Sequence, residues 1–224
     1  MQRHVAIRLA LDAGMAVSFV LLMAARYTGN NVHEWLGVLL FFLVMVHVRI
    51  HAAWWRALLP SLRIRPVRTV VTLFTALFFA GAVVSAVPVS ETVFAFWHGH
   101  GSLGARGVHM FFAHWALLMA AVHFGMYGSG VSAAVGRALP VFVPSPLCRL
   151  LAWGTALYGL WAFISRELVL PILMQTSFTL WHEGDGPVLF FLDYLAVFHA
   201  AAWLSYGVMS FFSARAGRRE RKSP

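Results

Sequence analysis

The feature that most constrains the fold of this chain is a series of long apolar stretches, of which Gly107 to Gly128 is the most informative. A segment of about 20 mostly apolar residues is long enough to cross the hydrocarbon core of a bilayer as an α-helix. The composition agrees, because 60% of the residues are hydrophobic and only 11% are charged, whereas roughly a quarter of an average soluble domain is charged. The sequence therefore predicts an integral membrane protein.

Hydropathy and turn residues divide the chain into six expected spans, so the predicted fold class is an all-α helical membrane bundle. The spans are expected at Val5 to Tyr27, Val32 to Trp55, Thr69 to Val87, Gly107 to Gly128, Leu147 to Ser165 and Val188 to Phe212. Residues 1–224 are interpreted as a single membrane domain. Residues Leu168 to Trp181 are apolar but interrupted by Pro171, and we expect them to lie along the membrane interface.

The distribution of basic residues predicts the orientation of the chain. The net charge is +9, but the basic residues lie at span ends and in Arg215 to Lys222, so we expect no nucleic-acid partner. With both termini in the cytoplasm, only Arg26, Arg106 and Arg166 of the Lys and Arg residues lie outside, in accordance with the positive-inside rule. No convincing small-residue cleavage site follows the basic start, so we expect the first span to be retained.

Histidines recur at equal spacing in two of the expected spans. His33 and His47 are 14 residues apart in the second span, and His109 and His123 are 14 residues apart in the fourth. Fourteen helical residues rise about 21 Å and leave the two side chains within roughly 40° of one face. A single span separates the two helices, so they run parallel. We therefore expect His33 to face His109 near the outer surface and His47 to face His123 near the cytoplasm.

Two histidine pairs between parallel helices are the ligand set expected for two haem b groups held between the second and fourth spans, and such ligation suits electron transfer. The single cysteine, Cys148, excludes covalent Cys-x-x-Cys-His attachment and a cysteine-ligated iron–sulfur cluster, so the haems would be bound non-covalently. Gly37, Gly107 and Gly125 are expected to make room for the macrocycles. Candidate partners of the haem propionates are arginines at the span ends, namely Arg26 or Arg106 outside and Arg49 or Arg68 inside.

The sequence around these histidines resembles an uncharacterised bacterial family of cytochrome-b-like membrane domains. The motifs that carry the resemblance are Leu11-Asp12, Thr28-Gly29, His33-Glu34-Trp35-Leu36-Gly37, His47, Arg106-Gly107-Val108-His109, His114-Trp115 and His123-Phe124-Gly125. The family usually has a tyrosine where His114 stands and a further histidine near Tyr127, so the chain departs from it at these two positions.

The resemblance covers residues 5–130 and implies a four-helix di-haem core there, followed by two additional spans in 131–212 and a basic cytoplasmic tail at 213–224. Together with the spans and the distribution of basic residues, it predicts a multi-pass protein of the bacterial inner membrane with both termini in the cytoplasm. The histidine spacing is similar in geometry to that of ferric reductases and quinol-oxidising cytochrome b, which is an analogy and no evidence of shared function.

The other histidines of the spans are expected to have different roles. His51 is 18 residues from His33, a rise of about 27 Å that the fourth helix cannot match, so we expect it at the interface. His114 points about 140° away from His109 and about 180° away from His123. Packing or a hydrogen bond is therefore its expected role.

Three further features have simpler interpretations as well. For His199, a structural role and a quinone site are equally supported by the sequence. His98 and His100 could form a metal site, but an exposed loop with incidental histidines is the favoured interpretation. Arg8 and Asp12 are four residues apart in the first span and are expected to pair.

The pattern supports one leading hypothesis and two alternatives. The leading one is a di-haem b-type membrane cytochrome that transfers electrons across or along the cytoplasmic membrane between a quinone or carrier and a partner redox protein. The alternatives are a ferric- or quinone-reductase-like oxidoreductase and a haem-free helical protein for transport or assembly. The chain has no flavin- or nicotinamide-binding motif, so we interpret it as the electron-transfer membrane subunit of an oxidoreductase. Its expected partners are membrane lipid and a redox protein, with quinone as a further candidate.

Overall fold

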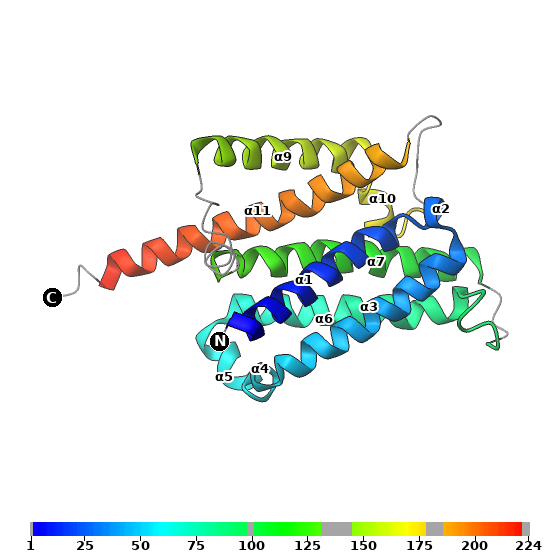
Figure 1. Ribbon diagram of the computed structural model, residues 1–224, viewed down its shortest axis with the longest axis horizontal. Helices are drawn as coiled ribbons and strands as arrows, with labels where there is room; N and C mark the ends of the chain where they lie inside the picture. Colours follow the sequence, from blue (N-terminus) through cyan, green and yellow to red (C-terminus); the bar gives the residue numbers. More distant parts are fainter. Residues whose placement is uncertain (1, 98–100, 131–144, 178–185, 221–224) are drawn as a thin grey trace.

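The computed structural model describes residues 2–97, 101–130, 145–177 and 186–220. All regular structure in these residues is helical, and the long helices form a bundle (Figure 1). Within the same residues, six helices are long and apolar enough to cross a membrane. The all-α fold class and the six expected spans are therefore confirmed, and the protein is a multi-pass membrane protein.

The six spanning helices are joined by short helical segments. The long helices are α1 (Gln2–Met23), α3 (Asn30–Ile50), α6 (Pro66–Ala86), α7 (Leu103–Met126), α9 (Pro146–Ser165) and α11 (Pro187–Glu220). The short ones are α2 (Ala25–Thr28), α4 (Ala52–Arg56), α5 (Leu58–Ile64), the 3₁₀ turn η1 (Val87–Val89) and α10 (Val169–Ile172). Helix α3 ends earlier than expected, and α11 continues to Glu220, so most of the expected tail 213–224 is helical.

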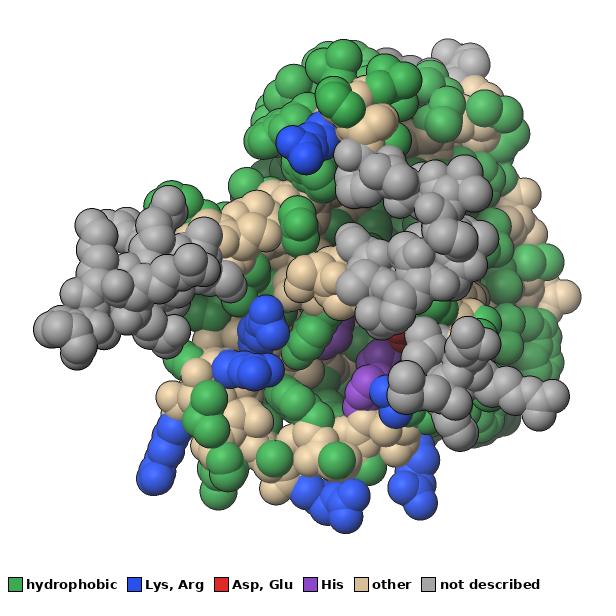
Figure 2. Space-filling model, turned by 60° about the vertical axis from the view of Figure 1, so that its left-hand side comes forward, with side chains coloured by type: hydrophobic (Ala, Val, Ile, Leu, Met, Phe, Trp, Pro, Cys, Tyr) green, Lys and Arg blue, Asp and Glu red, His purple; other side chains and the backbone are tan. Residues whose placement is uncertain are grey.

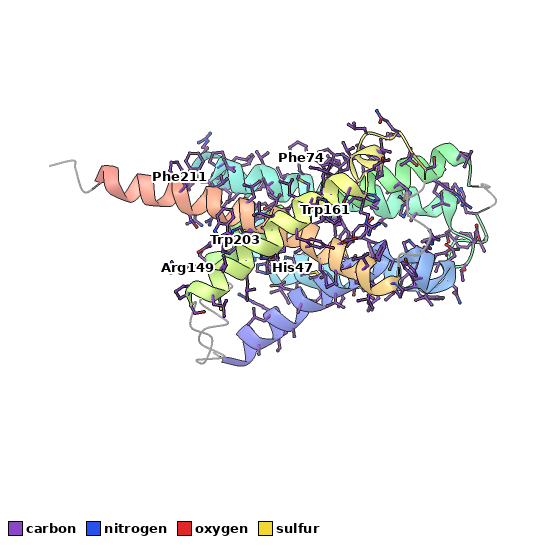
Figure 3. All side chains as sticks on the ribbon, turned by 90° about the horizontal axis from the view of Figure 1, so that it is seen from above. His47, Phe74, Arg149, Trp161, Trp203 and Phe211 are labelled. Carbon is purple, nitrogen blue, oxygen red and sulfur yellow. The ribbon has the colours of Figure 1, made fainter. Side chains whose placement is uncertain are left out.

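Helix α7 lies near the middle of the bundle (Figure 1), packed against α6 on one side and α11 on the other. Helix α9 packs along α11, and α1 packs along α3. The apolar core gathers on α1, α7, α9 and α11 and includes Leu117, Phe190 and Tyr194. Large apolar side chains elsewhere point outward, as Figure 3 shows for Phe74 and Trp161, which are 47% and 57% exposed. Such a surface is suited to contact with lipid.

After α9 the chain folds back on α7 through α10, which belongs to the segment that the sequence predicts along the membrane interface. Pro171 and Ile172 of α10 are buried, and the indole of Trp115 donates a hydrogen bond of 3.1 Å to the carbonyl of Ile172. Glu167 and Met174, on either side of α10, have φ angles of 50° and 56°. This left-handed conformation allows a sharp turn of the backbone before α10 and another after it. The described part of the segment, up to Ser177, is thus partly core.

The two ends of the bundle are named here by their histidines. The His33 end contains α2 and the loop after η1, and the His47 end contains α4 and α5 (Figure 1). At the His33 end, the carboxylate of Glu34 accepts hydrogen bonds from the Ser90 hydroxyl at 2.6 Å and from the backbone N–H of Val93 at 2.7 Å. It also accepts from the N–H groups of Glu91 and Thr92. These bonds fasten the loop to the start of α3, beside His33.

Candidate functional site

His33 and His109 come together at the His33 end of the bundle, one from α3 and the other from α7. Their ring centroids are 6.2 Å apart and their planes are at 86° to each other. Metal–imidazole bonds are about 2 Å long, so two imidazoles that bind one metal ion from opposite sides have centroids roughly 6 Å apart. The separation of this pair therefore fits a shared metal ion.

A neighbouring helix fixes the orientation of each ring in this pair. Nδ1 of His33 lies 2.9 Å from the carbonyl oxygen of Leu22 in α1, and Nδ1 of His109 lies 3.1 Å from the carbonyl oxygen of Ala82 in α6. A carbonyl can only accept, so Nδ1 carries the proton and Nε2 keeps its lone pair. Histidines that bind metals usually have this second hydrogen bond, which fixes the tautomer and the direction of the ring.

At the His47 end, a neighbouring helix likewise binds Nδ1 of each histidine. Nδ1 of His47 lies 3.0 Å from Oδ1 of Asp12 in α1, and Nδ1 of His123 lies 3.3 Å from the hydroxyl of Thr72 in α6. Figure 2 looks towards this end and shows histidine side chains in a hollow with arginine or lysine side chains around it. Among the described side chains, the carboxylate of Asp12 forms an ion pair with His47 and none with Arg8, so the expected pairing of Arg8 with Asp12 is not found.

All four histidines thus have a hydrogen-bonded Nδ1. Nε2 of these four makes no hydrogen bond within the part of the chain that the structure describes. Each helix pair, α1 with α3 and α6 with α7, supplies both the ligand and its orienting partner at both ends of the bundle.

A buried apolar layer lies between the two histidine pairs. Leu40 is seven residues from both His33 and His47, and Ala116 is seven residues from both His109 and His123. Leu40 is 3% exposed and Ala116 is 1% exposed. Over their whole lengths the backbones of α3 and α7 are not closely packed against each other, whereas α6 packs along α7. The wider separation of α3 from α7 is what a flat ligand between them requires.

His51 lies just beyond α3 and contacts His47. The ring centroids are 4.7 Å apart, with the planes tilted by 43°. Partial burial, together with the nearby His47 and Arg8, lowers the pKa of His51 below its usual value. His51 therefore belongs to the surroundings of the site at the His47 end.

His114 and His199 differ from the four paired histidines, because their Nε2 atoms contact other groups of the protein. Nδ1 of His114 bonds to the carbonyl of Met110 at 2.8 Å, and its Nε2 lies 3.4 Å from the hydroxyl of Tyr194. Nε2 of His199 bonds to the carbonyl of Ala152 at 3.1 Å, and its ring stacks on Trp203. The expected hydrogen-bonding role of His114 is confirmed, and His199 has structural contacts.

The glycines singled out in the sequence lie against protein. A Cβ on Gly125 would collide with the carbonyl of Ala202, so Gly125 allows α11 to approach α7. A Cβ on Gly37 would lie 3.9 Å from Leu22 of α1, and one on Gly107 would lie 3.2 Å from the Ser177 hydroxyl. Gly125 is therefore required for a close approach of two helices, whereas a Cβ on Gly37 would make only an ordinary van der Waals contact.

The expected arginines lie at the ends of the bundle. Arg106 forms an exposed ion pair of 3.4 Å with Glu91, and Arg68 lies over the ring of Tyr127 at 5.4 Å. Arg26 and Arg49 are exposed. His98 and His100 lie outside the described residues.

The sequence analysis missed a buried ion pair between α9 and α11. Nε of Arg166 lies 2.8 Å from Oδ2 of Asp193, and the two side chains are 8% and 2% exposed. The hydroxyl of Tyr158 donates to the other oxygen of Asp193. The signal was present, because a carboxylate inside an apolar span is costly unless it is paired.

Among the described residues, no three or more His, Cys, Asp or Glu side chains form a group that could hold a metal ion. The candidate ligands therefore occur as pairs. Comparisons of the chain with models of protein families, with characterised proteins and with solved structures find no match.

Proposed function

We propose that this protein is a di-haem b-type membrane cytochrome that transfers electrons between a quinone or carrier and a partner redox protein. His33 and His109 would hold one haem, and His47 and His123 the other. Bound haem supplies one-electron redox chemistry, and two axial imidazoles suit electron transfer. This assignment keeps the expected resemblance to cytochrome-b-like membrane domains as part of the proposal.

The observation that carries the proposal is that the same nitrogen, Nδ1, is hydrogen-bonded in all four histidine rings. In each of them a neighbouring helix binds Nδ1, as expected for a histidine that binds metal through Nε2. The 6.2 Å separation of His33 and His109 fits two imidazoles on either side of one iron. A haem held by two histidines would also account for candidate ligands that occur in pairs among the described residues.

The protein residues have three tasks in this function. The hydrogen bonds to Nδ1 hold the imidazoles in place, so that little rearrangement accompanies a change of redox state. Leu40 and Ala116 exclude water from the layer between the pairs. The exposed apolar side chains keep the bundle in lipid. Arg49 and Arg106, at opposite ends of the bundle, remain the candidate partners of the propionates, and Arg106 would then exchange Glu91 for a propionate.

The orientation is part of the proposal. We place the protein in the inner membrane of bacteria, as the resemblance implies. The positive-inside rule favours both termini in the cytoplasm, which puts the His47 end on the cytoplasmic side. A reporter that is active only in the cytoplasm should be active when it is fused after Lys222. Activity of a periplasm-specific reporter at the same position would reverse the orientation of both sites.

An absorption spectrum of the purified protein, oxidised and then reduced with dithionite, tests the function. We expect two low-spin haems per chain, both extracted into acid–acetone because Cys148 provides no covalent attachment site. A colourless, folded preparation from haem-sufficient cells would favour the haem-free transport or assembly protein instead. Rapid reduction of ferric complexes or quinone by the isolated chain would favour the reductase-like alternative.

A further inference from the structure

The partners of the four Nδ1 atoms differ in charge. His33 and His109 bond to backbone carbonyls, and His123 bonds to a hydroxyl. His47 instead bonds to the carboxylate of Asp12 at 3.0 Å. The His47–His123 site is therefore the one with a formally charged group hydrogen-bonded to a proposed ligand.

Asp12 places its carboxylate against this site. The side chains of His47 and Asp12 are 27% and 33% exposed, so protein replaces much of the surrounding water. Arg8, one turn earlier in α1, makes no ion pair with Asp12 among the described side chains. His51 contacts the His47 ring and not the carboxylate. Among the described side chains, the hydrogen bond and ion pair of the Asp12 carboxylate are thus with the proposed ligand itself.

A carboxylate in this position has a predictable effect on a bound metal. It increases the basicity of the ligand through the hydrogen bond. It also adds a negative charge, which stabilises the oxidised, more positive state of the iron over the reduced state. Both effects lower the reduction potential, and second-shell hydrogen bonds of this kind are a recognised means of adjusting haem.

We propose that Asp12 is a positioning residue that lowers the reduction potential of the haem held by His47 and His123 and so makes the two haems unequal. This inference rests on the proposed function. The contribution of Asp12 favours electron transfer from the His47 end to the His33 end, because the site of lower potential is the better donor. At the other end, the carboxylate of Glu34 accepts hydrogen bonds from the loop after η1 and not from the ring of His33 or His109, so that site has no carboxylate bonded to a proposed ligand.

A redox titration followed by absorbance tests this inference with wild-type protein and Asp12→Asn. The amide keeps the size of the side chain and an oxygen acceptor but removes the charge. We expect the reduction equilibrium of one haem to shift about tenfold towards the reduced form, which is about 59 mV for a one-electron couple. The other haem should be unchanged. The shifted haem should be the one that is lost in His47→Ala.

Two further variants control the experiment. Asp12→Glu restores the charge and should return the potential most of the way to the wild-type value. Glu167→Gln removes an exposed carboxylate between α9 and α10, and should shift neither haem. If Asp12→Asn does not retain the haem, Asp12→Ser removes the same charge with less bulk and is judged by the same criterion.

The outcomes separate this inference from the proposed function. Two bound haems with potentials unchanged in the Asp12 variants would overturn the role of Asp12 and leave the di-haem assignment in place. A shift of both haems by the same amount would also overturn it, because the hydrogen bond reaches only His47. Wild-type protein without haem would overturn both.

Discussion

The histidines of α7 have different hydrogen-bond partners on the side of the helix towards α3 and on the side towards α11. On the side towards α3, His109 and His123 are held through Nδ1 alone, and the two backbones stay apart. On the side towards α11, both nitrogens of His114 have partners, and Gly125 brings the backbones into contact. The three histidines of this apolar helix thus have two kinds of surroundings. Nε2 has a partner in His114, whereas Nε2 of His109 and His123 has none among the described residues.

The α11 side is closed by protein contacts, so changes there should affect stability before they affect a cofactor. The largest effect is expected from Asp193→Asn, which removes the buried negative charge that contacts the Arg166 guanidinium. Breaking a buried pair in this way costs about 3–5 kcal/mol. The free energy of unfolding in detergent, from an SDS titration, measures the loss.

The double variant Arg166→Met with Asp193→Leu is the matched control. Replacing both charges with apolar groups should recover most of the stability. Each variant that folds should keep the wild-type haem content per folded chain, since the pair contacts none of the four paired histidines. Haem loss in folded protein would show that the two sides of α7 are not independent.

Gly125→Ala is expected to have the next largest effect. Its Cβ would meet the carbonyl of Ala202 in α11, so the helices must separate, at a cost of about 1–3 kcal/mol for overpacking. Gly207→Ala on α11 is the control, because a Cβ there meets no atom within 4 Å. Equal unfolding free energies for the two variants would contradict the close contact between α7 and α11.

His114→Phe should cost about 1 kcal/mol, the net value of a typical hydrogen bond. The variant loses the contact of the ring with the Tyr194 hydroxyl but keeps an aromatic side chain in the core. Both haems should remain in its absorption spectrum. Loss of one haem would move the ligand of α7 from His109 to His114 and remove the distinction between the two sides.

The smallest effect is expected on the α3 side in protein made without haem. There His33→Phe loses the single bond to the Leu22 carbonyl, which is worth about 0.5–1.5 kcal/mol. In haem-loaded protein the same change should also remove the stabilisation that binding provides. Unfolding titrations of both preparations measure this difference, and an equal cost in both would argue against His33 as a ligand.

Much of the fold could be predicted because bilayer thickness fixes the length of a span, and helix geometry fixes which side chains share a face. These two rules gave the six spans and the expected meeting of His33 with His109, which the structure brings together. They also placed His114 away from that pair. None of these predictions required knowledge of how the helices pack.

The details that the sequence did not reveal depend on contacts between helices. Spacing alone suggested that Asp12 pairs with Arg8, but the approach of α1 to α3 gives it His47 as its partner. Gly125 could have faced either neighbour, and only the packed bundle shows that it faces α11. Asp193 could have been found as a carboxylate inside a span, although its partner Arg166 lies 27 residues away.

The central claim is that four histidines form two pairs, and the haem content of four single variants tests it most directly. His33→Ala and His109→Ala should give the same reduced-minus-oxidised spectrum, which lacks one haem. His47→Ala and His123→Ala should also match each other and lack the other haem, which lies about 20 Å away along the helix axis. His199→Ala, whose Nε2 already bonds to Ala152, should keep both. Four folded variants that each retain both haems, or losses that pair His33 with His47, would contradict the account.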